Sequence, residues 1–103
     1  MAYKIDDVFS ALADNNRRQI LIMLSDDKLT VNAISEKFNI SRPAISKHLK
    51  ILLKTNLVVP LQKGRERYYQ LNVEPLNEVQ KWLEFYDKFW DKRLHLLKNV
   101  VEK

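Results

Sequence analysis

Basic side chains gather in about a quarter of this chain of 103 residues. Positions 41–67 hold seven Lys or Arg against one acid, Glu66, a charge of +6, whereas the rest sums to −1 because the whole chain has 18 basic and 13 acidic residues. The seven are Arg42, Lys47, Lys50, Lys54, Lys63, Arg65 and Arg67. Solvated surfaces usually mix their signs, so this one-sided block indicates binding to a polyanion.

Residues able to do catalytic or metal chemistry are few. There is no cysteine, which excludes a disulfide framework, a thiolate metal site and a cysteine nucleophile. The two histidines, His48 and His95, lie 47 positions apart, and neither belongs to a nucleophile motif or a phosphate loop. The sequence therefore predicts a protein that is not an enzyme and that uses no cofactor and no metal.

Length and composition indicate one domain over residues 1–103. The chain is 46% hydrophobic and 30% charged, the balance of a folded globular protein. No segment resembles a signal peptide, and charges interrupt every apolar stretch well before the roughly 18 residues of a membrane span. We therefore expect a cytoplasmic protein.

Apolar spacing and capping residues predict four helices in the first half. Ile5 begins a stripe spaced by threes and fours, which indicates a helix over about 4–13. Side chains able to cap three further helices stand at Asp14, Thr30 and Ser41. Predicted inward positions on those helices are Ile20, Leu21, Leu24, Val31, Ile34, Phe38, Ile45, Leu49, Leu52 and Leu53.

The third and fourth helices, over about 30–55, match a helix-turn-helix. When Ile45 and Leu49 point inward, the lysines of the fourth helix turn outward at about 100° per residue. Recognition helices read bases with their amino-terminal turns. We therefore expect Arg42, Ser46 and Lys47 at base edges and Lys50 and Lys54 at phosphates, with Ser41 and Ala44 also in the DNA-binding surface. His48 either packs on the helix or donates to a phosphate.

A β-hairpin is predicted over about 57–72. The one glycine, Gly64, separates two stretches rich in strand-forming residues. Pro60 cannot donate to a central ladder, so the first strand should be short or at an edge. Tyr69 and Leu71 should face inward on the side of Arg67, and Tyr68 outward. The basic tip, Lys63, Arg65 and Arg67, suits a wing that touches DNA beside the recognition helix.

A last helix of about 27 residues, about 40 Å long, is predicted over 75–101. It carries two apolar rows, more than one small domain needs to bury, and a second copy of the chain is the simplest partner. The expected dimer interface is Ile5, Phe9, Trp82, Phe85, Tyr86, Phe89, Trp90, Leu94 and Leu97. Two alternatives stay open: both rows seal the core of one chain, or the aromatic side chains form a ligand pocket.

These segments together resemble the ArsR-type winged-helix repressors over nearly the whole chain. The motifs are Ala11-Leu12-Ala13-Asp14 with Arg17-Arg18, then Ser41 to Leu49, then Leu57-Val58, and Gly64-Arg65 before Tyr69-Gln70-Leu71. The resemblance implies a mostly α fold with a small β-hairpin wing, a winged helix-turn-helix with helical dimerisation ends at about 4–13 and 75–101. It also implies a homodimer that represses transcription from a palindromic operator, its own promoter included, until a signal releases it.

Departures from the family pattern bear on that signal. Many members sense metals through cysteines in the third helix, where this chain has Thr30 and Asn32. Asp87, Asp91 and His95 lack the paired spacing of a second metal site in the last helix. Asn56 stands where glycine is usual, and Asn tolerates the left-handed conformation there. The chain looks like the cysteine-free autorepressor branch. Its inducer is either a ligand or a protein partner that relieves repression, and the residues do not distinguish the two.

Two other functions compete with the repressor. An adaptor would bind a protein partner or a membrane surface through the aromatic and basic last helix, without stable membrane insertion. An RNA-binding module is a further alternative, although a lysine-bearing helix beside a hairpin suits the duplex major groove better than stacking on single strands. Double-stranded DNA and a second copy of the chain therefore remain the expected partners.

Overall fold

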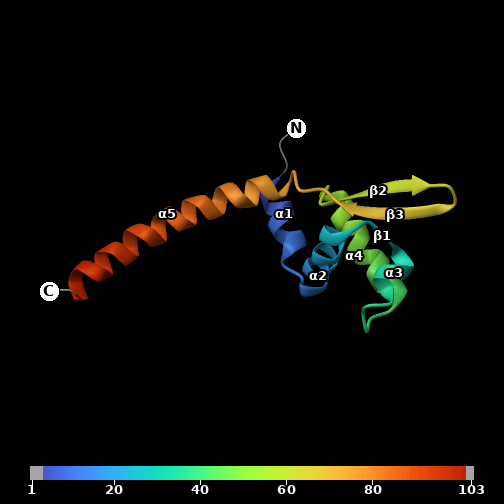
Figure 1. Cartoon of the computed structure of the whole chain (residues 1–103), viewed down its shortest axis with the longest axis horizontal. Coiled ribbons are helices and arrows are strands. Elements are labelled where there is room, and N and C mark those ends of the chain that lie inside the picture. Colours follow the sequence, from blue (N-terminus) through green and yellow to red (C-terminus); the bar gives the residue numbers. More distant parts are fainter. Residues whose placement is uncertain (1–3, 102–103) are drawn as a thin grey trace.

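The computed structural model describes residues 4–101, except for the side chains of Leu94 and of residues 97–101. Its elements follow the order α1 (Ile5–Leu12), α2 (Asn15–Asp26), β1 (Leu29–Thr30), α3 (Val31–Ser35), α4 (Arg42–Lys54), β2 (Val58–Lys63), β3 (Glu66–Leu71) and α5 (Leu76–Val101). Figure 1 shows α1 to α4 and the sheet gathered at one end, while α5 runs away from them. The molecule measures 67 × 34 × 21 Å as a result.

The three predicted capping side chains are confirmed. Asp14 accepts from the backbone N–H of Arg17 at 3.1 Å, Thr30 from that of Ala33 at 3.2 Å, and Ser41 from that of Ala44 at 3.3 Å. Each bond satisfies a first-turn amide that has no partner within its own helix. Helix α3 nevertheless spans only five residues, so Phe38, expected on it, lies beyond its end.

Asn56 ends α4 in the left-handed conformation, with φ 61°, as its side-chain type allows. The backbone N–H of Leu57 then donates to the carbonyl of Leu52 at 3.0 Å. This pattern satisfies a carbonyl of the last turn and directs the chain into β2.

The sheet has three antiparallel strands in the order β1-β3-β2. Pro60 lies on β2 and pairs with Tyr69 of β3. Because β2 is an edge strand, it tolerates the missing N–H of proline. Gly64 takes φ 60° in the turn. The strand β1 was not predicted, because two residues are too few to show an alternating pattern. Its pairing with β3 joins the hairpin to the helix-turn-helix.

The predicted core is largely confirmed. Its buried members are Val8, Ala11, Ile20, Leu21, Leu24, Ile34, Ile45, Leu49, Leu52, Leu57 and Val58. Val31, Phe38 and Leu53 are only partly buried and pack at its margin, as do Tyr69 and Leu71. Tyr68 is half-buried rather than free on the outer face, because it pairs with Thr30 of β1 and the Lys28 ammonium lies 5.6 Å from its ring centre.

Helix α5 leaves the core after its first turn. Leu76 and Val79 pack against the buried cluster. The large apolar side chains that follow are exposed: Trp82, Leu83, Phe85, Tyr86, Phe89, Trp90 and Leu96. The alternative in which both apolar rows seal the core of one chain is therefore wrong for the described side chains. Leu94 and Leu97, expected in the dimer interface, lie outside the described residues.

Candidate nucleic-acid interface

The two faces of α4 are sharply divided. Ile45 and Leu52 are 0% exposed and Leu49 is 2% exposed, because this stripe packs into the core. The opposite face, which is exposed, consists of Ser41, Arg42, Pro43, Ser46, Lys47, Lys50 and Lys54. The predicted outward stripe is therefore present, and its amino-terminal end carries the side chains expected at base edges.

Within the described part of the chain, the cations of this face have no acidic partner. Among the residues that the structure describes, no carboxylate lies within 4.0 Å of Arg42, Lys47, Lys50 or Lys54. Unpaired cations on a rigid helix can release counterions from a phosphate backbone when they bind it. The face is thus electrostatically suited to duplex DNA.

The wing carries the second group of cations. Lys63, Arg65 and Arg67 are exposed at the turn between β2 and β3, and Figure 1 shows this turn projecting beyond the helices. The amide of Gln62 donates to the carbonyl of Gly64 at 3.0 Å, which braces the turn. The guanidinium of Arg67 lies 5.4 Å from the ring centre of Tyr69, on the face predicted for it. Arg65 is left at the tip.

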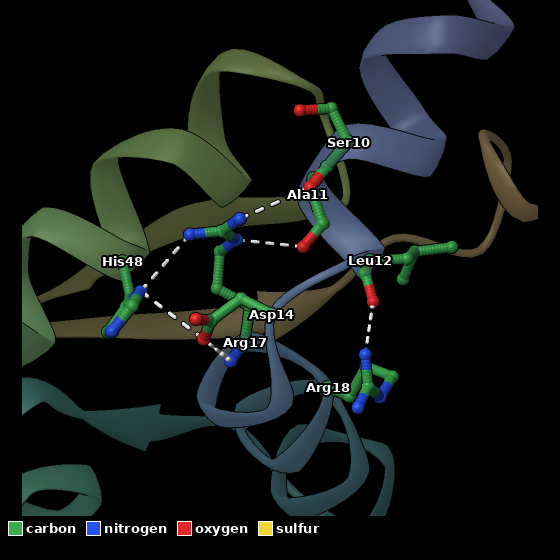
Figure 2. A network of polar contacts seen from close by, with 7 residues as sticks. All are labelled: Ser10, Ala11, Leu12, Asp14, Arg17, Arg18 and His48. Atoms are coloured by element: carbon green, nitrogen blue, oxygen red, sulfur yellow. Dashed lines mark hydrogen bonds and ion pairs between the residues drawn. The ribbon is translucent and has the colours of Figure 1, made fainter.

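Two predicted DNA-binding residues are less accessible than the rest. Ala44 is half-buried. The side chain of His48 is only 17% exposed, since its ring lies against the start of α2 rather than in the outward stripe. Its Nδ1 lies 3.3 Å from Nη1 of Arg17 and 3.8 Å from Oδ2 of Asp14, and both contacts are drawn as dashed lines in Figure 2. Of its two predicted settings, this geometry favours packing.

Arg17 connects α1 to α4, a role that the sequence analysis missed. Its Nε donates to the carbonyl of Ala11 at 2.7 Å and its Nη2 to that of Ser10 at 3.1 Å, while its Nη1 meets His48. The last carbonyls of a helix lack an intrahelical partner, and the guanidinium supplies one to Ala11 and a second donor to Ser10, whose carbonyl also accepts from the N–H of Ala13 at 3.2 Å. The predicted cap at Asp14 was a local signal for its contact with the first turn of α2, but nothing in the sequence pointed to His48, 31 positions from Arg17.

Asp14 joins this network through its charge. The backbone N–H of Arg17 is the main cause that lowers the pKa of its carboxyl, and the positive potential of His48 and Arg17 adds to the effect. An ionised carboxylate is therefore favoured at the start of α2, where a helix also favours negative charge.

A separate aromatic face runs along α5. Phe9 of α1 meets Trp82 edge to face at 5.9 Å, and Trp82 stacks on Tyr86 at 5.8 Å. Trp90 continues the row, and its ring centre lies 5.8 Å from that of Tyr86 and 6.2 Å from that of Phe89. These rings touch one another but leave much of their surface open to solvent. The structure thus brings the predicted interface residues of α1 and α5 together at Phe9 and Trp82.

Comparison with known proteins agrees with this architecture. A family model described as "Bacterial regulatory protein, arsR family" matches residues 14–59, the segment from the cap of α2 into β2. The transcriptional repressor SdpR of Bacillus subtilis (strain 168) is 40% identical over 79 residues, which cover 77% of this chain and 88% of that protein. The chain belongs to the ArsR family. The resemblance inferred from the motifs is thereby confirmed.

Further members of the ArsR family extend the likeness. The arsenical resistance operon repressor of Staphylococcus aureus is 34% identical over 80 residues, 77% of each chain. The solved "ArsR-like Transcriptional Regulator from Rhodococcus sp. RHA1" superimposes with a TM-score of 0.78 at 34% identity and covers 95% of this chain and 90% of its own. The protein is accordingly a winged helix-turn-helix, DNA-binding transcriptional repressor of the ArsR family, not an enzyme.

The described residues, 4–101, contain neither a membrane-spanning helix nor a group of metal-binding side chains. No helix there is both long and apolar enough to cross a membrane. No three His, Asp or Glu side chains there are grouped so that they could hold a metal ion.

Proposed function

We propose that this ArsR-family protein represses transcription as a homodimer on a palindromic operator, that its own promoter carries such an operator, and that metals are not its signal. It would act in the cytoplasm, where bacterial DNA lies. The observation that carries the proposal is the unpaired basic face of α4, followed directly in the chain by the basic wing tip.

The predicted division of labour on this surface agrees with its exposure. Arg42, Ser46 and Lys47 stand on the exposed amino-terminal half of α4, the end that enters a major groove in helix-turn-helix proteins. Arg and Lys pair best with the O6 and N7 acceptors of guanine. Lys50, Lys54 and the wing cations would bind phosphates, which set position rather than sequence preference.

The homodimer is supported by the aromatic face of α5. Phe85 is 67% exposed, Trp82 49% and Phe89 47%, on a helix that projects from the rest of the chain. A contiguous apolar patch of this kind marks a protein interface, and twofold homodimers dominate soluble oligomers. A dimer would set two recognition helices about 34 Å apart, one turn of DNA, which is the spacing of a palindromic operator.

The absence of metal sensing is supported by the residues at the matching positions. Thr30, which stands where the metal-sensing family members carry a cysteine, instead caps α3 with its hydroxyl. The whole chain has no cysteine to supply a thiolate. Arsenite and Zn²⁺ should therefore leave operator binding unchanged at concentrations that release a metal-sensing relative.

A gel shift across a salt series tests the proposal. The probes are the DNA upstream of the protein's own gene, the same DNA with one half-site scrambled, and random duplex of equal length. We expect at least about a 10³-fold preference for the upstream DNA over random duplex, a steep loss of affinity with salt, and weaker binding to the single half-site. A preference ratio near one would reject the proposed operator, and equal binding to one and two half-sites would reject the dimer.

A further inference from the structure

A cavity between α1 and α4 lies beside the network of Figure 2. Its volume is about 540 Å³, and its charged and polar lining includes Lys4, Asp7 and Ser10 from α1 and its start, Arg17 from α2, and Lys54 and Thr55 from the end of α4. Small-molecule sites typically occupy about 300–1,000 Å³. The cavity therefore has the volume of a metabolite site, and one edge of it belongs to the recognition helix.

The charge of the lining favours an anion. Three cations, Lys4, Arg17 and Lys54, face one carboxylate, Asp7, an excess of two positive charges. Among the residues that the structure describes, neither lysine has a carboxylate within 4.0 Å. Two uncompensated cations across a polar hollow match a ligand that carries two negative charges.

Arg17 adds a rigid receptor group to the cavity. A guanidinium has five N–H donors, and three are engaged with the carbonyls of Ala11 and Ser10 and with Nδ1 of His48. Two N–H groups, one on each terminal nitrogen, remain. Because the side chain is already held in place, a carboxylate or phosphate group that binds it orders no further side chain, and planar guanidinium geometry suits both groups.

We propose that this cavity binds a small divalent oxyanion, a phosphate monoester or a dicarboxylate, and that its binding weakens the grip of the protein on DNA. The effect on DNA rests on the function proposed above, whereas the binding of the anion does not.

Two contacts carry the effect to α4. An anion on the free N–H groups of Arg17 places negative charge beside Nδ1 of His48, which lies 3.3 Å from Nη1; this contact is longer than the two to α1 at 2.7 and 3.1 Å, so it is the one that the anion weakens first. The anion also neutralises Lys54, which is otherwise available to a DNA phosphate. A weaker His48 contact loosens the connection of the recognition helix α4 to α1, and a neutralised Lys54 loses its DNA phosphate. Both changes lower operator affinity. The signal that releases DNA is then a metabolite anion bound at the junction of α1 and α4.

Calorimetric titration of the full chain without DNA tests the binding step. The probes are inorganic phosphate and succinate, each at constant ionic strength made up with NaCl. We expect one saturable site per chain for at least one probe. Lys4→Ala should weaken it about threefold and Asp7→Asn should tighten it about threefold, as expected for single charges at a partly exposed site. Asp6→Asn is the matched control, because it removes the same charge one residue away, outside the cavity lining, and should change little.

Nitrogen NMR of the two histidines tests the coupling. Bound phosphate should shift the Nδ1 resonance of His48 and leave that of His95, far along α5, unchanged. Saturating probe should also reduce operator affinity at least threefold in the wild type, and Lys4→Ala should blunt this response while its affinity in chloride stays at the wild-type value. No saturable site with either probe, or a site that leaves His48 unshifted, would overturn the proposal. Weak operator binding by Lys4→Ala in chloride would also overturn it, since the cavity would then receive a phosphate of DNA.

Discussion

Helices α4 and α5 both present an outward face that no part of the described chain covers, and the two faces differ in kind. The face of α4 is short and basic, and its lysines have no acidic partner among residues 4–101. That of α5 is long and aromatic, with rings in contact with one another. The inner stripe of α4 is fully buried, whereas α5 touches the core only near its beginning.

The difference indicates different partners. An exposed basic face stays well solvated alone and gains most from a polyanion, whose condensed counterions it displaces. Exposure of each aromatic ring to water is unfavourable, so an aromatic face is stabilised when it is buried against another apolar surface. Binding at α4 should therefore depend strongly on salt, and association through α5 only weakly.

The largest expected effect follows from placing charge on the aromatic face. Phe85→Glu with Phe89→Glu would bury two carboxylates in the proposed dimer interface, which is costly without partners. We expect the dimer dissociation constant to rise at least about 100-fold, or about 2.7 kcal/mol. Sedimentation equilibrium measures it directly, and affinity for a palindromic operator should fall with it.

Lys88→Glu is the control for this pair. It changes the net charge by the same two units and stands on α5 between the two phenylalanines, but outside the predicted interface. Its dimer constant should stay close to that of the wild type. If the double variant remains as dimeric as the control, the interface lies elsewhere and the partner of the aromatic face is another molecule.

A smaller effect is expected on the basic face at a base-reading position. Lys47→Ala should weaken operator binding by about 1–3 kcal/mol and relax base preference at one position of each half-site. Binding to a library of operators with single base changes measures both quantities. Lys88→Ala, which removes a lysine from α5, should leave both unchanged.

The outcome at Lys47 also separates two roles. Equal losses on operator and on random duplex would assign Lys47 to a phosphate and move the reading of bases to Arg42 and Ser46. A loss confined to the operator would place Lys47 at a base edge.

Most of the helix-turn-helix was predictable from the sequence because its signals are local. Capping side chains at Asp14, Thr30 and Ser41 and apolar spacing along α4 act within a few residues, and each was found where expected. Asn56, which stands where the family usually has glycine, takes the left-handed conformation that was expected to be tolerated there, and Gly64 lies in the predicted hairpin turn with a positive φ.

The rest depended on contacts between distant segments. The strand β1 is defined by its pairing with β3, whose paired residues lie 38 and 40 positions later, and not by any pattern of its own. The link from Arg17 to His48 crosses 31 positions and requires α2 and α4 to be packed together first. Spacing therefore located the cations that face solvent, but not the arginine that ties the recognition helix to α1.

The wing should show the salt dependence of the basic surface without its sequence preference. Arg65→Ala removes one predicted phosphate contact, so the slope of log affinity against log salt should fall by about 0.9. Random duplex should show the same change as operator, because phosphates carry no base information. Arg65→Lys should restore the slope. An unchanged slope for the alanine variant would remove Arg65 from the DNA contacts.

The smallest expected effect concerns Asp14, whose pKa is lowered mainly by the N–H of Arg17. A carboxyl with a depressed pKa in the folded state stabilises the protein above its unfolded pKa of about 3.9, and this stability is lost as pH falls through the folded value. Asp14→Asn keeps the cap and removes the charge, so it should cost only about 0.3–1 kcal/mol at pH 7. Urea unfolding measures this difference in the free energy of unfolding from pH 7 to 2, and the difference from wild type should close below about pH 4.

Asp87→Asn, which removes a carboxylate from the middle of α5, is the control and should show no such difference. A gap that persists at pH 2 would mean that Asp14 acts at the start of α2 through its shape and not its charge, and the electrostatic link from this helix to His48 would then be absent.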